Sequence, residues 1–181
     1  MANGILKVGE ITTSSGSGNI TIGSGVTLNS NTPAFRAVLS ANQSMAENTH
    51  VLGAFDEEVF DTNNAYNNTS SGNGYAFTVP AGHAGKYMFY SLTSTNSSAS
   101  TIEFIQASFY LNGTRVTNNY IDLQNNEGGA LSGSTSIVFD LNVGDYVQQY
   151  FRVGLNSGTP DLYAGSGDRK DSWFGAFRIG A

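Results

Sequence analysis

The sequence contains no cysteine and few charged residues, and both scarcities limit what the protein can do. None of its 181 residues is Cys, which excludes disulfide scaffolds, thiol catalysis and zinc sites built on thiolates. Lys, Arg, Asp and Glu make up 12% of the chain, about half the usual share. The net charge is −6 and the 8 Lys and Arg are scattered, so no basic stripe exists to neutralise phosphates. We therefore expect no nucleic-acid partner.

Long apolar runs and helical patterns are also missing. No stretch approaches the ~18 apolar residues of a membrane-spanning helix. Residues 1–16, MANGILKVGEITTSSG, lack the basic region and the apolar run of an export signal. No segment repeats apolar side chains at helical spacing over about ten residues. We expect a protein that is made in the cytoplasm, without an export signal and without membrane insertion.

Catalytic motifs are absent as well. His50 and His83 are the only histidines, and both lie beside residues typical of loops. The sequence contains no P-loop, no G-x-G-x-x-G, no G-x-S-x-G and no H-E-x-x-H. We predict that the protein is not an enzyme and that it has no catalytic residue, no cofactor and no bound metal. A glycan-active enzyme, with carboxylates brought together only by the fold, is the weakest of three functional hypotheses.

Two acidic groups offer an alternative to the metal-free interpretation. Calcium takes about six to eight oxygen ligands, which carboxylates and loop carbonyls supply. The first group is Asp56, Glu57, Glu58 and Asp61, and the second is Asp161, Asp168 and Asp171. We favour solvated loop charge for both groups.

The clearest structural pattern is β-strand alternation. Aromatic and β-branched residues alternate over 75–79, and a Pro- and Gly-rich turn follows at 80–85. Residues 87–90 then carry apolar side chains on both faces, which indicates a strand covered on both sides. From Thr32 onward about nine or ten short strands are separated by turns. The polar segments 91–100 and 125–134 are expected to be loops. The pattern predicts an all-β sandwich or jelly roll.

Several motifs resemble those of C1q/TNF-like domains. The order Phe77, Pro80, Gly85, Tyr87 and Phe89 is similar to the central signature of that family. The resemblance continues, in the expected order, with LNG at 111–113, SIVFDLNVGDYV at 136–147 and SWFGAFRI at 172–179, and upstream with segments 33–43 and 59–66. In the last motif Phe177 replaces the usual aliphatic residue.

The resemblance covers about residues 33–181 and implies a jelly-roll β-sandwich that assembles as a homotrimer. A sheet rich in aromatic residues and poor in charge suits a large subunit interface. We predict that truncation of a core aromatic residue costs about 3–5 kcal/mol. The predicted jelly-roll core contains Phe77, Tyr87, Phe89, Phe139, Trp173 and Phe177.

Residues 1–32 differ from the rest and are interpreted as an N-terminal, extended, β-rich attachment arm. Short alternating apolar pairs are separated by Gly- and Ser-rich turns. A flexible linker is the alternative, but such a linker does not need paired β-branched residues. The arm residues expected to make contacts are Leu6, Val8, Ile11, Ile20, Ile22, Val26 and Leu28. The pattern resembles the N-termini of virion structural proteins from tailed bacteriophages.

These resemblances imply a phage virion protein, made in the host cytoplasm and located on the virion surface. The first hypothesis is a trimeric capsid decoration (cement or spike) protein whose arm clamps the shell, with the major capsid protein or tail proteins as partners. The second is the receptor-binding tip of a tail fibre or baseplate that recognises host surface glycan. Tyr66 and Tyr163 are candidate sugar-stacking residues for the second hypothesis.

Overall fold

The computed structural model describes residue 24 and residues 32–97, 101–123 and 128–180. The chain divides into two units, Met1–Ser30 and Asn31–Ala181, and the fold below is that of the second. The predicted arm residues Leu6, Val8, Ile11, Ile20, Ile22, Val26 and Leu28 lie outside the described residues, so the arm stays a prediction. Among the described residues, no helix is long and apolar enough to cross a bilayer.

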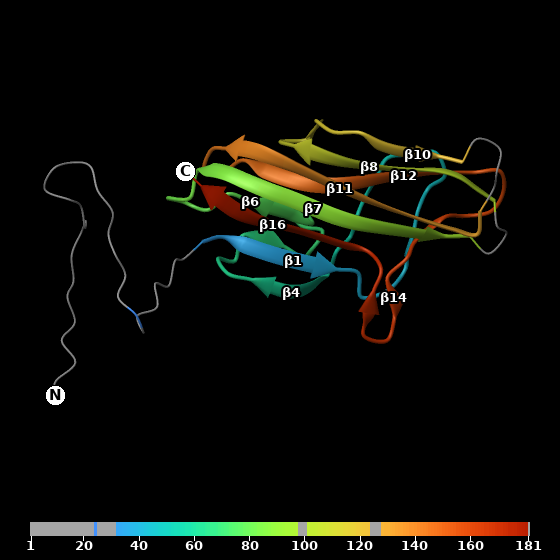
Figure 1. Cartoon of the computed structure of the whole chain (residues 1–181), viewed down its shortest axis with the longest axis horizontal. Helices are drawn as coiled ribbons and strands as arrows, with labels where there is room; N and C mark the ends of the chain where they lie inside the picture. The colour runs from blue at the N-terminus through green and yellow to red at the C-terminus, as the bar shows by residue number, and fades with distance from the viewer. Residues whose placement is uncertain (1–23, 25–31, 98–100, 124–127, 181) are drawn as a thin grey trace, which may run out of the picture. The chain divides into compact units, whose positions relative to one another are not determined.

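Two antiparallel sheets pack face to face in a β-sandwich (Figure 1). The first sheet runs in the order β11, β7, β16, β1 and β4. Its strands are β1 (Ala34–Val38), β4 (Glu57–Asp61), β7 (Gly85–Asn96), β11 (Ala130–Leu141) and β16 (Trp173–Gly180). At the far end of β7 it is extended by β13 (Asp161–Leu162) and β2 (Gln43–Ser44).

The second sheet runs in the order β10, β8, β12, β6 and β5. Its strands are β5 (Tyr66–Asn67), β6 (Ala76–Thr78), β8 (Ile102–Leu111), β10 (Asn119–Asp122) and β12 (Tyr146–Leu155). The short β3 (Val51–Leu52) pairs with β12, and β9 (Thr114–Arg115) pairs with β8. A separate hairpin joins β14 (Gly165–Ser166) to β15 (Arg169–Lys170).

The prediction of polar loops beside β7 and β11 is partly wrong. β7 continues to Asn96, and β11 begins at Ala130 and pairs with β7 along its whole length. The hydroxyl side chains of Ser91, Thr93 and Thr95 point inward and are fully buried. Small β-compatible residues therefore continue the strand where large apolar residues stop.

The predicted hairpin at Asn112 and Gly113 is present between β8 and β9, with φ angles of 50° and 77°. Asn112 also fixes the neighbouring turn between β11 and β12. Its Nδ2 donates to Oδ1 of Asp145 at 2.8 Å, and the Tyr146 amide donates to its Oδ1 at 2.9 Å. Asp145 in turn accepts the Asn142 amide at 2.8 Å. The two turns at this end of the sandwich are thus held together by side-chain amides and one carboxylate.

The core between the sheets is largely aromatic. Phe35 is stacked on Tyr66 at 4.6 Å between ring centres, and it meets Phe174 edge-on at 5.0 Å. Of the predicted core residues, Phe77, Tyr87 and Phe89 are fully buried. Phe139 is half-buried and packs against the core, with its ring 5.7 Å from that of Phe89.

The core prediction is wrong for Phe177 and incomplete for Trp173. Phe177 is 43% exposed and Trp173 is half-buried. In β16 it is Phe174 and Ala176 that face inward, each at most 1% exposed. Since side chains alternate along a strand, residues 173 and 177 must lie on the outer face of the first sheet.

Candidate functional site

The outer face of the first sheet carries a group of apolar and aromatic side chains that we call the aromatic face. It consists of Met88, Tyr90, Val138, Trp173 and Phe177. The strand register places Met88 between Val138 on β11 and Phe177 on β16. Val138 is 49% exposed and Phe177 is 43% exposed. These apolar side chains are neighbours rather than isolated surface residues, which makes the face a candidate interaction surface.

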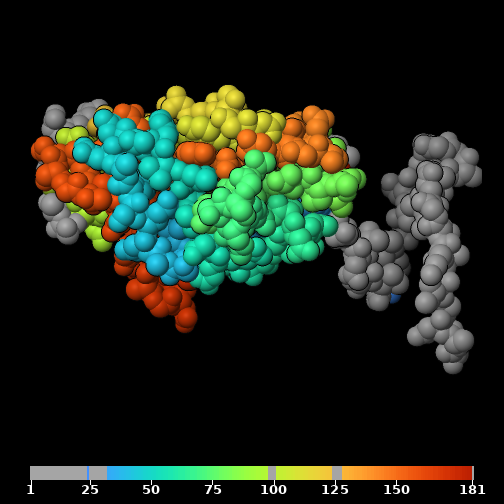
Figure 2. All heavy atoms as spheres, turned by 180° about the vertical axis from the view of Figure 1, so that it is seen from behind, coloured from blue at the N-terminus to red at the C-terminus, as the bar shows by residue number. Residues whose placement is uncertain are grey.

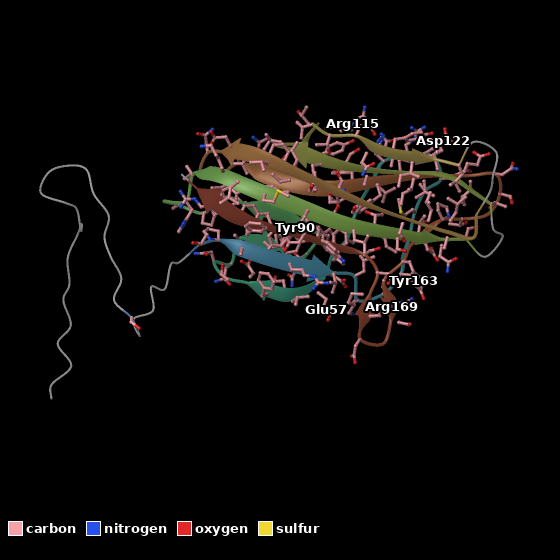
Figure 3. All side chains as sticks on the ribbon, viewed as in Figure 1. Glu57, Tyr90, Arg115, Asp122, Tyr163 and Arg169 are labelled. Atoms are coloured by element: carbon pink, nitrogen blue, oxygen red, sulfur yellow. The ribbon has the colours of Figure 1, made fainter. Side chains whose placement is uncertain are left out.

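Tyr90, labelled in Figure 3, contacts two other aromatic side chains of the aromatic face. Its ring centre is 5.4 Å from that of Trp173, edge-on, and 6.0 Å from that of Phe177. Gly175 makes this arrangement possible, because a Cβ atom there would lie 2.7 Å from Cζ of Tyr90. The Tyr90 ring therefore lies across β16, where any other residue would displace it.

Arg36 brings a positive charge to the edge of this face. Its guanidinium carbon lies 5.4 Å from the centre of the Trp173 ring, a cation–π geometry. Its Nε is buried and has no hydrogen-bond partner. Burial raises the pKa of Tyr90, and the nearby charge of Arg36 offsets part of that rise. Tyr90 therefore stays neutral beside the Arg36 guanidinium.

The two tyrosines proposed for sugar stacking have different environments. The prediction for Tyr66 is wrong: its side chain points into the core, is 5% exposed and donates its hydroxyl to the Phe55 carbonyl at 3.0 Å. Burial raises its pKa strongly. Tyr163 instead lines a surface hollow of about 400 Å³ beside the end of β7. Arg169 and Asp171 line the same hollow and form an ion pair at 2.8 Å.

The acidic residues considered for calcium are engaged separately. Asp56 accepts both the amide and the hydroxyl of Ser40, at 2.9 and 2.6 Å. Glu57 pairs with Lys170 at 2.8 Å. The described part of the chain brings no three His, Asp or Glu side chains together in a group that could hold a metal ion.

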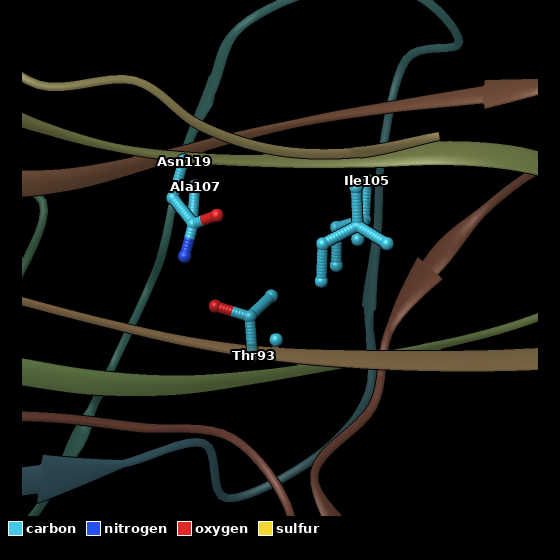
Figure 4. Close-up of a pocket in the computed structure, with 6 residues that line it drawn as sticks. Thr93, Ile105, Ala107 and Asn119 are labelled. Carbon is cyan, nitrogen blue, oxygen red and sulfur yellow. The ribbon is translucent and has the colours of Figure 1, made fainter. Parts of the chain in front are cut away.

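The surroundings of His50 and of one gap between the sheets bear on the question of catalysis. His50 accepts a hydrogen bond from Arg115 at 3.1 Å, so its partner is a cation rather than an orienting carboxylate. Between the sheets, a gap bordered by Thr93, Ala107 and Asn119 leaves no room for a water molecule (Figure 4). This gap therefore offers no space for a substrate.

The arrangement of strands matches solved structures from two protein groups. The globular domain of zebrafish complement 1qA protein matches with a TM-score of 0.53 and 16% identity, covering 82% of this chain and 98% of that one. Murine APRIL matches with a TM-score of 0.56 and 12% identity, covering 82% of this chain and 99% of that one. The fold is a C1q/TNF-like jelly roll. No protein-family model matches the sequence, and no curated protein matches it.

In this C1q/TNF-like jelly roll, the aromatic face is the feature that sequence reasoning located least well. The sequence predicts Trp173 and Phe177 in the core, and it places Tyr90 on the second face of its strand without indicating what covers that face. The signal was nevertheless present, because apolar residues on both faces of 87–90 indicate that something covers the second face. The sequence could not show that this cover is absent within a single chain.

Proposed function

We propose that this chain is a homotrimeric, non-catalytic structural protein and that its subunits associate through the aromatic face. C1q/TNF-like domains typically form trimers. The observation that carries the proposal is the contact group of Tyr90, Trp173 and Phe177 on a strand face that no part of the described chain covers. A cyclic trimer would bury these side chains and remove them from water.

We further propose that the trimer is a decoration protein on the capsid of a tailed bacteriophage. Support comes from the N-terminal segment, whose β-branched pairs and Gly- and Ser-rich turns resemble those of phage virion proteins. In the sandwich, β1 begins beside the end of β16, since Ala34 pairs with Phe177. Three arms, one from each subunit, would attach the trimer to the major capsid protein.

Two matched valine substitutions test the assembly. Val138→Asp places a carboxylate on the aromatic face, whereas Val116→Asp places one just after β9, beside the second sheet. The two side chains are similarly exposed, at 49% and 43%. Sedimentation velocity should give a trimer for the wild type and for Val116→Asp and a folded monomer for Val138→Asp. A wild-type monomer, or a trimer that survives Val138→Asp, would contradict the proposed interface.

The location on the virion is tested by cryo-electron microscopy of the particle with which the protein co-purifies. Threefold knobs at capsid symmetry positions, with residues 1–32 along the shell, would support decoration. Full-length variants with Ile20→Asp and Ile22→Asp should then lose binding to the particle but remain trimeric. Density found only at fibre tips would reject decoration in favour of host recognition.

A second function, recognition of host surface glycan by a tail fibre or baseplate tip, is favoured by the hollow at Tyr163. Ser94 and Asn96 line it together with the Arg169–Asp171 ion pair. Such a set offers donors and acceptors for sugar hydroxyls beside an aromatic ring. Tyr163→Ala should abolish binding of neutral host glycan on an array, while Tyr75→Ala, also half-buried but away from this hollow, should not. Equal binding by both variants would exclude the hollow.

A further inference from the structure

The outer face of the second sheet holds a group of cationic and aromatic side chains that we call the arginine–tyrosine surface. It consists of His50, Tyr110, Arg115, Tyr150 and Arg152. Figure 2 shows the cyan segment, which includes β3, beside the yellow segment, which includes β8, β9 and β10. The surface combines charge and aromatic rings on a chain whose net charge is −6.

Cross-strand stacking builds the aromatic part of this surface. The rings of Tyr110 on β8 and Tyr150 on β12 lie 4.0 Å apart at an interplanar angle of 30°. The His50 ring is 6.4 Å from that of Tyr110. Tyr110, Tyr150 and His50 are all half-buried, so their rings are fixed in place while part of each stays accessible. The two tyrosine rings stack on each other, which makes the pair rigid, and the apolar face of a sugar ring can pack on the ring surface that they do not use against each other.

Two arginines supply the charge next to these rings. Arg115 Nη1 donates to Nε2 of His50 at 3.1 Å. Burial lowers the pKa of His50, and the charges of Arg115 and Arg152 lower it further. His50 is therefore neutral near pH 7 and lies within the electrostatic reach of both guanidinium groups.

Arg152 is held in a defined position. Its Nε donates to the Asn48 carbonyl at 3.1 Å, and its Nη2 donates to Oδ1 of the same residue. Asn48 has a φ of 55°, a conformation that Asn adopts more readily than most residues. The guanidinium carbon also lies 5.1 Å from the centre of the Phe104 ring. That ring crosses β12 at Gly154, where a Cβ atom would be 2.1 Å from Cε1 of Phe104.

Among the described residues, no carboxylate lies within ion-pair distance of the two arginines. Neither Arg115 nor Arg152 forms an ion pair there, whereas Arg169 and Lys170 each pair with an acid. Glu103, Asp122 and Arg152 all act electrostatically on Tyr120, so acidic groups lie near the Arg152 side of the surface. Arg152 uses Nε and Nη2 on Asn48, and Arg115 uses Nη1 on His50. Nη1 of Arg152 and the Nε and Nη2 edge of Arg115 remain to donate to a carboxylate or sulfate.

We propose that the arginine–tyrosine surface is a binding site for an acidic saccharide, with the sugar ring against Tyr110 and Tyr150 and its carboxylate or sulfate between Arg115 and Arg152. A single anionic sugar fits two guanidinium groups, whereas the net negative charge of the chain disfavours a polyphosphate. The site lies on the sheet opposite the aromatic face, so the inference does not depend on trimer formation. Three such sites in a trimer would add avidity.

Isothermal titration of the full chain with defined oligosaccharides tests this proposal. Hexagalacturonate represents a carboxylated sugar, a heparin hexasaccharide a sulfated one, and maltohexaose a neutral one. We expect at least one acidic probe to bind, with affinity that falls as salt rises, and maltohexaose not to bind. Tighter binding of the heparin probe would assign the anion as sulfate.

Matched arginine substitutions locate the binding. Arg115→Gln and Arg152→Gln should each lower the affinity about tenfold or more, because each removes charge-assisted hydrogen bonds. Lys86→Gln, which removes an exposed positive charge on β7 outside both proposed saccharide sites, should leave the affinity unchanged. Arg115 is exposed, so its variant should fold, which circular dichroism would verify. Equal affinity in the three variants, no binding of either acidic probe, or equal binding of maltohexaose or of a single-stranded hexathymidylate would overturn the proposal.

Discussion

The guanidinium of Arg36 and the ring of Trp173 lie 5.4 Å apart on the outer face of the first sheet, on the adjacent strands β1 and β16. Trp173 is the single tryptophan of the chain. It is half-buried within one subunit, and Tyr90 covers one of its edges. Its fluorescence therefore reports directly on whether the aromatic face is covered.

We predict that dilution shifts the emission maximum of Trp173 to longer wavelength as subunits separate. The cause is the exposure of the indole ring to water when the proposed interface opens. Emission spectra over a range of concentrations should follow the mass measured by sedimentation. The Val138→Asp variant should show the long-wavelength spectrum at every concentration. A constant spectrum during dissociation would place Trp173 outside the interface.

Phe174 and Phe177 should respond very differently to truncation, although they lie three positions apart on β16. Phe174 is fully buried against Phe35 and Tyr66, so Phe174→Ala should lower the free energy of unfolding by about 3–5 kcal/mol. Phe177→Ala should cost less than about 1 kcal/mol when both are measured in the monomeric Val138→Asp background. Urea denaturation measures both changes. Similar losses in the two variants would contradict the strand orientation.

In β16 the inward and outward faces are the opposite of those predicted, which shows what alternation alone can and cannot predict. Residues 173, 174 and 177 are all aromatic, so both phases of the strand look apolar in the sequence. A shift of one residue exchanges the two faces completely. The choice is made by contacts with distant residues: Phe35 and Tyr66 receive Phe174, and Tyr90 occupies the space above Gly175. At Phe77 and Phe89 the local pattern was sufficient.

The arginine–tyrosine surface could not be predicted from the sequence either, because its residues come from separate strands. His50 precedes β3, Arg115 ends β9 and Tyr150 lies on β12, and they meet only because β12 pairs with both β3 and β8. Motifs with local spacing, such as Asn112-Gly113, were found because their geometry depends on adjacent residues. Sites assembled across strands depend on sheet order, which periodicity does not specify.

Two adjacent glutamines on β12 should have opposite effects when each is replaced by Met. Gln149 points inward, is fully buried and has no hydrogen-bond partner on either amide atom. Gln149→Met should raise the free energy of unfolding by about 1–3 kcal/mol, because an unsatisfied buried amide is removed. Gln148 instead donates to the Gly74 carbonyl at 2.7 Å, so Gln148→Met should be destabilising. Thermal and urea unfolding measure both free energies of unfolding. If the two variants changed stability in the same direction, the prediction would be wrong.

Asp145 should make the stability of the protein sensitive to acid. The side chain of Asn112 and the backbone amide of Asn142 donate to its carboxylate, and these hydrogen bonds lower its pKa in the folded state. A lowered pKa means that the folded protein binds this proton less readily than the unfolded chain does. The stabilisation is therefore fully present above the unfolded pKa of about 3.9 and is lost as the pH falls through the folded pKa.

Asp145→Asn should accordingly lower stability at pH 7 but not at the acid end of the profile, where the wild-type carboxylate is protonated. The difference in free energy of unfolding between wild type and Asp145→Asn should shrink steadily below about pH 4. Asp168→Asn serves as the control, because it removes the same charge at an exposed position and leaves the hydrogen bonds of the two turns intact. Urea titrations at a series of pH values measure the three profiles. If the wild type and Asp145→Asn lost stability in parallel down to low pH, the hydrogen bonds from Asn112 and Asn142 would not be what links the two turns to acid stability.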